Sequence, residues 1–274
     1  MSRDRKGAVV SPLTGIRSLT VAVRCWLTLA LVLMLGASEN PEKLFQAGQQ
    51  AYLAEDYEKA MSLFEQALQA QPQNARYHNW YGKACGRRAE RVVFFRAVGL
   101  ARKVASSFEK AVELEPHNSG ALNDLLDFYL AAPPLVGGGL DKAPPLAERL
   151  AKISAPEGHR ARALILAKKK DYEGAEREYR RALELEPDKV GRLLELAAFL
   201  AERGRHSEAD TLFDRAARLA PDSPEYLFTR GKQLAVAKRH PQQARELLER
   251  YLKSPRKPDD PPRSEVEALL KKLG

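Results

Sequence analysis

Side chains that could carry catalysis or bind a metal are present in this chain, but their spacing suits neither role. The histidines are His78, His117, His159, His206 and His240. No two of them stand three or four residues apart, so no helix would present a pair of imidazoles to a metal ion. Cys85 has no histidine in its sequence neighbourhood, which favours a buried, unreactive thiol. These patterns predict no catalytic residues, no metal site, no cofactor and no enzymatic activity.

A cluster of arginines offers a different chemistry, the attraction of anions. The cluster consists of Arg87, Arg88, Arg91 and Arg96. Because Phe94 and Phe95 lie among these arginines, one interpretation is a basic, aromatic-bearing loop that contacts an anionic partner or a membrane surface. In the other interpretation, the two phenylalanines hold the loop against the rest of the protein. The arginines are then solvated or paired with acids such as Glu90.

The elements that would position these residues follow from a repeated stripe. It reads Ala60-Phe64-Ala67-Pro72, then Ala175-Tyr179-Ala182-Pro187, then Ala209-Phe213-Ala216-Pro221. Steps of four and three residues place the alanines and the aromatic on one face of a helix. The alanines admit a neighbouring helix, the aromatic fills the space between them, and the proline ends the helix. The last two stripes are about 34 residues apart, a period typical of stacked helix pairs.

On these residues the chain resembles the tetratricopeptide repeat family. The first helix of each repeat in that family carries an aromatic or leucine, then a leucine, then a glycine or alanine, and Leu44, Ala47 and Gly48 occupy those places ahead of the first stripe. The resemblance covers residues 41–257. It implies an all-α, right-handed superhelical solenoid of about six helix pairs. The expected division is a separate N-terminal segment at residues 1–38, a solenoid at 39–257, and a linker with a C-terminal capping helix at 258–274.

The resemblance also implies where a ligand binds. In the family, ligands lie in the concave groove formed by the first helices, at the fifth and ninth positions of each repeat. The candidate groove residues are Asn79, Lys83, Asn123, Asp127 and Arg160. Asparagine both donates and accepts hydrogen bonds, and Lys and Arg add charge, so the stretch would suit a peptide backbone or a carboxylate. The alternative is that these are ordinary exposed helix positions.

One family-specific ligand is not expected. The carboxylate clamp of the family requires a lysine and an asparagine in the first repeat, where Phe45 and Gln49 stand in this chain. Recognition of chaperone C-termini is therefore not predicted.

Two stretches exceed the repeat period, one at residues 86–100 and one at residues 131–140. Proline pairs and three consecutive glycines predict that the second is a loop. Asp141 is expected to cap the helix that follows, with Pro144 and Pro145 in its first turn.

The C-terminal residues predict a helix opened by a capping box of Ser264 and Glu267. Its apolar face would cover the exposed flank of the last repeat, and the alternative is that it docks a partner.

Residues 1–38 match the pattern of a secretory signal peptide, with basic residues first, the apolar core Cys25–Leu35, and then Gly36-Ala37-Ser38. As a helix the core would span about 17 Å, against roughly 30 Å of membrane hydrocarbon, which favours cleavage near Ser38. We therefore expect an exported protein, periplasmic or extracellular. The alternative is an uncleaved anchor in the inner membrane at residues 21–36.

The charge balance and the absence of a catalytic set point to a binding protein. The net charge of the whole chain is +9, and residues 1–38 hold five basic residues and one acid, so the remainder carries only +5. Nucleic acid is therefore not the expected partner. We expect a monomeric, non-enzymatic scaffold or adaptor that binds a segment of another protein in the concave groove, for example in assembly of an envelope complex. The alternative is a binder of membrane surfaces or polyanions through Arg87–Arg96.

Overall fold

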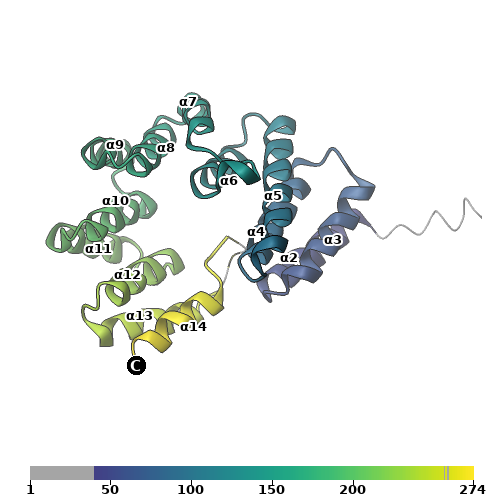
Figure 1. Ribbon diagram of the computed structural model, residues 1–274. Coiled ribbons are helices and arrows are strands. Elements are labelled where there is room, and N and C mark those ends of the chain that lie inside the picture. Colours follow the sequence, from purple (N-terminus) through teal and green to yellow (C-terminus); the bar gives the residue numbers. More distant parts are fainter. Residues whose placement is uncertain (1–39, 256, 258) are drawn as a thin grey trace, which may run out of the picture.

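The computed structural model describes residues 40–255, 257 and 259–274. Over these residues the chain forms thirteen α-helices and two short 3-10 helices, with no strand (Figure 1). The all-α fold and its superhelical arrangement of helix pairs are thus confirmed. The expected signal peptide at 1–38 and the alternative anchor at 21–36 lie outside the described residues.

Twelve of the helices form six antiparallel pairs, followed by a single C-terminal helix. The pairs are α2 (Pro41–Leu53) with α3 (Tyr57–Ala70), α4 (Ala75–Ala89) with α5 (Phe94–Leu114), α6 (Ser119–Ala131) with α7 (Pro144–Ile153), α8 (Ala155–Lys168) with α9 (Tyr172–Leu185), α10 (Val190–Glu202) with α11 (His206–Leu219), and α12 (Pro224–Val236) with α13 (Pro241–Lys253). The last helix is α14 (Arg263–Lys272).

Capping side chains and small residues explain why these segments form helix pairs. The side chains that accept a hydrogen bond from a backbone N–H at a helix N-terminus are Asn40, Asp56, Asn74, Asn118, Asp171 and Ser223. In the first two pairs, a glycine of the first helix receives an aromatic ring of the second. A Cβ at Gly48 would lie 2.5 Å from the Phe64 ring, and one at Gly82 would lie 2.6 Å from the Phe108 ring. This close approach fixes how the two helices of a pair pack.

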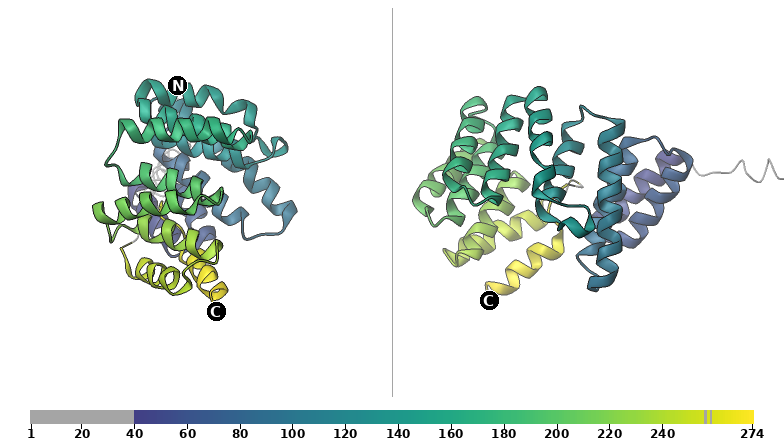
Figure 2. Two further views of the ribbon diagram at one scale, coloured as in Figure 1. Left: turned by 90° about the vertical axis from the view of Figure 1, so that its left-hand side faces the viewer. Right: turned by 45° about the horizontal axis from the view of Figure 1, so that its top comes forward.

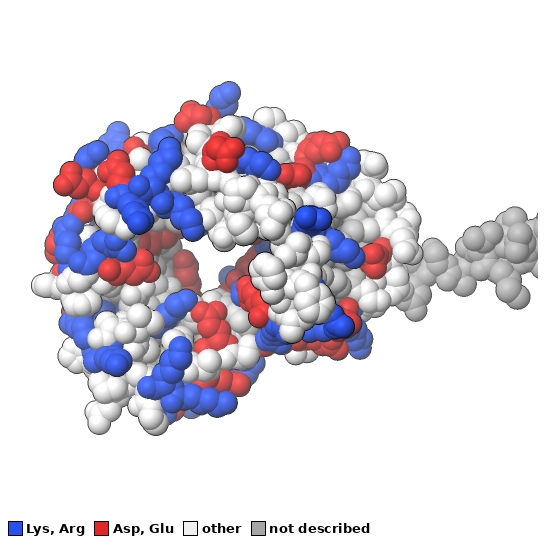
Figure 3. All heavy atoms as spheres, in the orientation of Figure 1, with Lys and Arg blue, Asp and Glu red and all other residues white. Residues whose placement is uncertain are grey.

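The array curves until its two ends meet. Successive units follow one another around a ring in Figure 1, and the space-filling view in Figure 3 shows an opening at its centre. α14 packs on α12 and α13 with Val266 and Leu269 buried, and Figure 2 shows it beside α13. The hydroxyl of Ser264 at the start of α14 also donates a hydrogen bond to Glu55 of the first unit, 2.6 Å away. The C-terminal helix therefore covers the last unit, as expected, and in addition contacts the first.

The expected basic loop at residues 86–100 is mostly helix. α4 continues to Ala89 and α5 begins at Phe94, so only four residues connect them. Residues 94–103 contain no proline and continue a helical pattern, so the additional residues lengthen the N-terminal end of α5. Phe94 and Phe95 are 81% and 73% exposed, which contradicts the interpretation that they hold this segment against the solenoid.

The second long stretch is a loop, as predicted, although its expected cap is wrong. Gly137 and Gly139 adopt φ values of 98° and 140°, a region that favours glycine. Asp141 lies in a 3-10 turn (Leu140–Lys142), and α7 begins after Ala143 without a side-chain cap. Prolines in the first turn of α7 are confirmed.

The predicted capping box at the C-terminal helix is also wrong. The residue before α14 is Pro262, and α14 begins at Arg263 with no side-chain cap. Ser264 is the second residue of the helix, and its hydroxyl is bonded to Glu55. The hydroxyl that the local pattern assigns to a helix cap is instead hydrogen-bonded to a residue near the opposite end of the chain.

Candidate functional site

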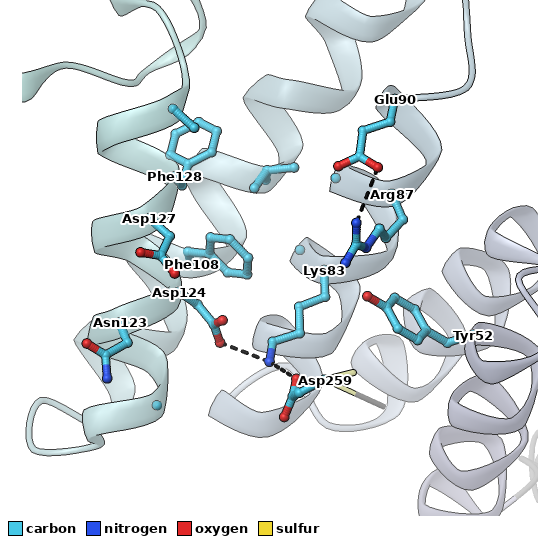
Figure 4. Close-up of a pocket in the computed structure, with 15 residues that line it drawn as sticks. Tyr52, Lys83, Arg87, Glu90, Phe108, Asn123, Asp124, Asp127, Phe128 and Asp259 are labelled. Carbon is cyan, nitrogen blue, oxygen red and sulfur yellow. Dashed lines mark hydrogen bonds and ion pairs between the residues drawn. The ribbon is translucent and has the colours of Figure 1, made fainter. Parts of the chain in front are cut away.

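The predicted groove residues come together on the concave side of the array, where the first helices of the repeats face the opening. A pocket of about 550 Å³ lies there, lined by residues of α4, α5 and α6, by Tyr52 of α2, and by Glu90 and Asp259 (Figure 4). Lys83, Asn123 and Asp127 all line it. Asn79 and Arg160 do not line the pocket but are hydrogen-bonded to residues that do.

Lys83 is not a free cation. Its ammonium group lies 3.2 Å from Asp124 and also forms an ion pair with Asp259. Asn79 donates a hydrogen bond of 2.8 Å to the same Asp124 carboxylate. Burial lowers the pKa of Lys83, but the two carboxylates outweigh burial and the net shift is upward. Lys83 and Asn79 are thus occupied by Asp124 and Asp259, neither of which was among the candidate groove residues.

Arg160 and Asn123, from neighbouring repeats, are in contact. The guanidinium of Arg160 donates to Glu195 at 2.5 Å and to the Asn123 side-chain oxygen at 3.3 Å. The Asn123 amide in turn donates to Glu157 at 3.2 Å. Both predicted residues therefore belong to one polar network that links α6, α8 and α10, in which Arg160 is already neutralised.

The centre of this network is a residue that the sequence analysis did not select. The Arg192 side chain is only 3% exposed and is ion-paired with Glu157, with Glu186 at 2.9 Å and with Glu195 at 3.0 Å. Glu157 and Arg192 are 35 residues apart, close to one repeat period. Opposite charges at this separation fall on adjacent first helices. That spacing is the sequence signal that would have identified the pair.

Two further carboxylates at this surface lack a partner. Asp127 on α6 and Glu225 on α12 make no hydrogen bond or ion pair with any described residue, although both side chains are exposed. The helices around them displace much of the surrounding water, and this desolvation raises the pKa of both, although the positive charge of Arg160 partly opposes the rise. For Glu225, the nearby Glu195 and Asp260 raise the pKa further.

Carboxylates therefore outnumber cations on the concave side. The cations are Lys83, Arg160 and Arg192, and Arg87 also lines the pocket together with its own partner Glu90. The carboxylates around them are Asp124, Asp127, Glu157, Glu186, Glu195, Glu225 and Asp259. Figure 3 shows acidic side chains gathered around the opening. The expected cationic stretch is a surface of net negative charge, because neighbouring repeats supply acids that more than balance the predicted cations.

Most of the arginine cluster is also neutralised. Arg88 pairs with Glu58 at 2.8 Å, and Arg87 contacts Glu90 at 3.4 Å. Arg91 pairs with Glu55 at 2.5 Å.

Arg96, on α5, forms no ion pair or hydrogen bond with the side chain of any residue that the structure describes. It lies next to the exposed Phe94 and Phe95.

Other functional classes find no support in the described part of the chain. Across residues 40–255, 257 and 259–274, no group of His, Cys, Asp and Glu side chains is arranged to hold a metal ion. Cys85 is completely buried, and burial raises the pKa of its thiol to about 11. Within the same residues no helix has the length and apolar character needed to cross a bilayer.

Comparison with known proteins agrees with the repeat geometry. The family profile described as Tetratricopeptide repeat matches residues 45–90, and a second profile of the same description matches residues 166–227. No match is found among curated protein sequences.

Solved structures of repeat proteins share the fold. A tetratricopeptide repeat protein from Parabacteroides merdae is 13% identical, with a TM-score of 0.61, over 90% of this chain and 89% of its own. A thermophilic tetratricopeptide repeat protein of Thermus thermophilus is 22% identical, with a TM-score of 0.53, over 71% of this chain and 99% of its own. At these identities the likeness concerns the arrangement of helices alone.

Proposed function

Because the chain is a tetratricopeptide repeat protein, we propose that it is a non-enzymatic scaffold that holds a segment of a partner protein against its concave surface. The observation that carries this proposal is the continuous polar surface facing the opening, to which the first helices of successive repeats each contribute. Such a surface offers donors and acceptors to a peptide backbone along its length.

The charge of the surface specifies the partner segment further. Lys83, Arg160 and Arg192 already form ion pairs with carboxylates, whereas Asp127 and Glu225 form no ion pair with any described residue. A lysine or arginine of a partner would give these two acids the direct ion-pair partner that they lack. We therefore propose that the partner segment is extended and basic.

Binding of two model peptides tests this proposal. We would measure fluorescence anisotropy with a labelled Lys-Ser repeat peptide and with a Glu-Ser repeat peptide of equal length. The Lys-Ser peptide is expected to bind, and Asp127→Asn with Glu225→Gln should weaken its binding by about three- to tenfold. The Glu-Ser peptide is not expected to bind.

A matched control separates site binding from attraction to overall charge. Asp214→Asn with Glu267→Gln removes the same number of exposed carboxylates, from α11 and α14, and should leave the affinity unchanged. Equal weakening by the two double variants, or tighter binding of the Glu-Ser peptide, would contradict the proposal.

The α5 end supports a second candidate function, contact with an anionic membrane surface. Phe94 and Phe95 are exposed beside the unpaired Arg96, and aromatic side chains next to a basic one suit the boundary between headgroups and acyl chains. Sedimentation with phosphatidylglycerol vesicles tests it. Phe94→Ala with Phe95→Ala should abolish pelleting, whereas Leu135→Ala, which shortens another exposed apolar side chain, should not.

We further propose that the protein is exported, with cleavage near Ser38, acts as a monomer, and serves in the assembly of an envelope complex. The composition of residues 1–38 supports export, because a basic start, an apolar core and small residues follow one another in the order of a signal peptide. N-terminal sequencing of protein from its native host should yield a chain that starts near Glu39. A soluble protein that retains Met1 would contradict export.

A further inference from the structure

The two ends of the array are joined by a small set of polar contacts, here called the clasp. On the C-terminal side it consists of Asp259 and Ser264, and on the N-terminal side of Glu55, Lys83 and Arg91. The Ser264 hydroxyl and backbone N–H donate to the Glu55 carboxylate at 2.6 and 3.2 Å, and Arg91 donates to the Ser264 hydroxyl at 2.8 Å. Asp259 is ion-paired with Lys83. These contacts close a ring out of what is otherwise an open superhelix.

The clasp differs in kind from the contacts that hold α14 to the last unit. Val266 is completely buried and Leu269 nearly so, and Lys232 of α12 pairs with Glu265 at 2.9 Å. The Tyr251 hydroxyl also donates to the backbone oxygen of Pro261 at 2.5 Å. Since Val266 and Leu269 are buried in the apolar core of the last units, α14 belongs mechanically to the last unit, and the ring would part between α14 and the first unit.

The clasp contacts are of a weak, salt-sensitive type. The side chains of Asp259 and Ser264 are exposed, whereas those of their partners Lys83 and Glu55 are only 16% and 14% exposed. Water and ions therefore reach these contacts from the C-terminal side and compete with them there. A solenoid adds flexibility, because each unit contacts only its neighbours and small changes at several interfaces add up to a large change at the ends.

Closure of the ring restricts what can reach the concave surface. A free chain end can pass through a closed ring, but an internal segment between two folded domains can enter only if the ring parts. We propose that the clasp opens reversibly and gates the central opening, so that internal segments of a partner are admitted only in the open state. The link to a partner rests on the proposed scaffold function, whereas opening of the clasp does not.

Distance measurement between spin labels tests the opening without any partner. Labels would be placed at Lys59→Cys on α3 and Ala268→Cys on α14, both exposed, in the full chain with Cys25→Ser. The buried Cys85 has a raised thiol pKa and would remain unlabelled. At low salt we expect one short-distance population by pulsed electron paramagnetic resonance.

Disruption of the clasp should remove that population. Asp259→Asn with Ser264→Ala should shift the labels to longer separations, and high salt should do the same to the unsubstituted clasp. Glu267→Gln on the same helix is the matched control and should keep the short distance. Circular dichroism should be unchanged throughout. The inference is overturned if the short distance persists in the double variant. It is also overturned if the protein with the unsubstituted clasp lacks the short distance at low salt.

Access to the opening is tested with the Lys-Ser peptide in two forms, one with free ends and one fused to a folded domain at each end. The fused peptide should associate at least tenfold more slowly than the free one, and Asp259→Asn with Ser264→Ala should abolish the difference. Equal rates without those substitutions would show that the clasp is no gate. If neither peptide binds, the scaffold proposal fails and the gate fails with it, while the spin labels still decide whether the ring opens.

Discussion

Arg192 on α10 and Glu157 on α8 form an ion pair in which the arginine is almost completely shielded from water and the glutamate mostly so. The Arg192 side chain is 3% exposed and that of Glu157 18%. Two more carboxylates, Glu186 and Glu195, bind the same guanidinium. One arginine thus connects three successive helices at the concave side, and the arrangement depends on it, because its removal would leave several partly buried carboxylates without a counter-charge.

We predict that Arg192→Leu destabilises the protein by about 3–5 kcal/mol, the range found when one partner of a buried ion pair is removed. The matched control is Arg181→Ala, which breaks an exposed pair with Glu184 and should cost less than about 1 kcal/mol. Urea denaturation followed by circular dichroism measures both. If Arg192→Leu lowers the free energy of unfolding no more than Arg181→Ala does, the network does not stabilise the fold.

The second prediction concerns two helical glycines with opposite surroundings. A Cβ at Gly158 on α8 would lie 2.4 Å from the Ala151 Cβ and 2.5 Å from its Cα, so α7 and α8 would have to separate. Gly158→Ala should therefore destabilise by about 1–3 kcal/mol. Gly99 on α5 has no atom within 4 Å of an added Cβ, and Gly99→Ala should stabilise by about 0.5–1 kcal/mol through helix propensity. Thermal unfolding of the two variants should shift in opposite directions.

The third prediction is that Cys85 is unreactive in the folded protein. Its side chain is completely buried and its thiol pKa is raised to about 11, so the thiolate is both scarce and inaccessible. In the full chain with Cys25→Ser, reaction with Ellman's reagent at neutral pH should be at least about a hundredfold slower than in denaturant. Fast reaction in the native state would place this thiol at a site that opens, and its inert role would have to be abandoned.

The fold was predictable because it depends on local periodicity. The stripe from Ala60 to Pro72 requires only residues within one helix and the next, and each repeat contacts chiefly its neighbours. The same reasoning failed where a partner comes from far along the chain. Ser264 has the local pattern of a cap, but Glu55, 209 residues away, binds its hydroxyl. Curvature of the whole array brings these two together, and no short window of sequence contains that curvature.

The candidate site was predictable in position but not in charge. Repeat phase assigned Lys83 and Arg160 to one surface; Lys83 lines the pocket, and Arg160 contacts Asn123, which also lines it. Their neutralisation depends on Asp259 and Glu195, which come from other units. The sign of a surface is a sum over side chains from several helices, so selecting residues one repeat at a time gave the location and missed the net charge.

The last prediction uses the pH dependence of Asp127 and Glu225 in the free protein. Desolvation raises both pKa values above those of the unfolded chain, so the folded state binds protons more tightly at these groups. Their contribution to stability is therefore favourable at low pH and is lost as the pH rises through the raised values. Asp127→Asn with Glu225→Gln replaces both carboxyls with neutral amides, so the variant should not lose this stability as the pH rises. Because both side chains are exposed and solvent screens them, the gain at neutral pH should be only about 0.5 kcal/mol.

The difference between this double variant and the unsubstituted protein carries the test. In urea denaturation, the difference in the free energy of unfolding between the two proteins should be largest at neutral pH. It should shrink as acid protonates the two carboxyls of the unsubstituted protein. Asp214→Asn with Glu267→Gln provides the control, which should show no such trend. The substitutions that weaken binding of the Lys-Ser peptide should thus stabilise the free protein, since the two unpaired acids cost stability until a basic segment pairs with them. A double variant that is less stable than the unsubstituted protein at neutral pH would mean that Asp127 and Glu225 support the fold instead, and the assignment of a basic partner would lose its basis.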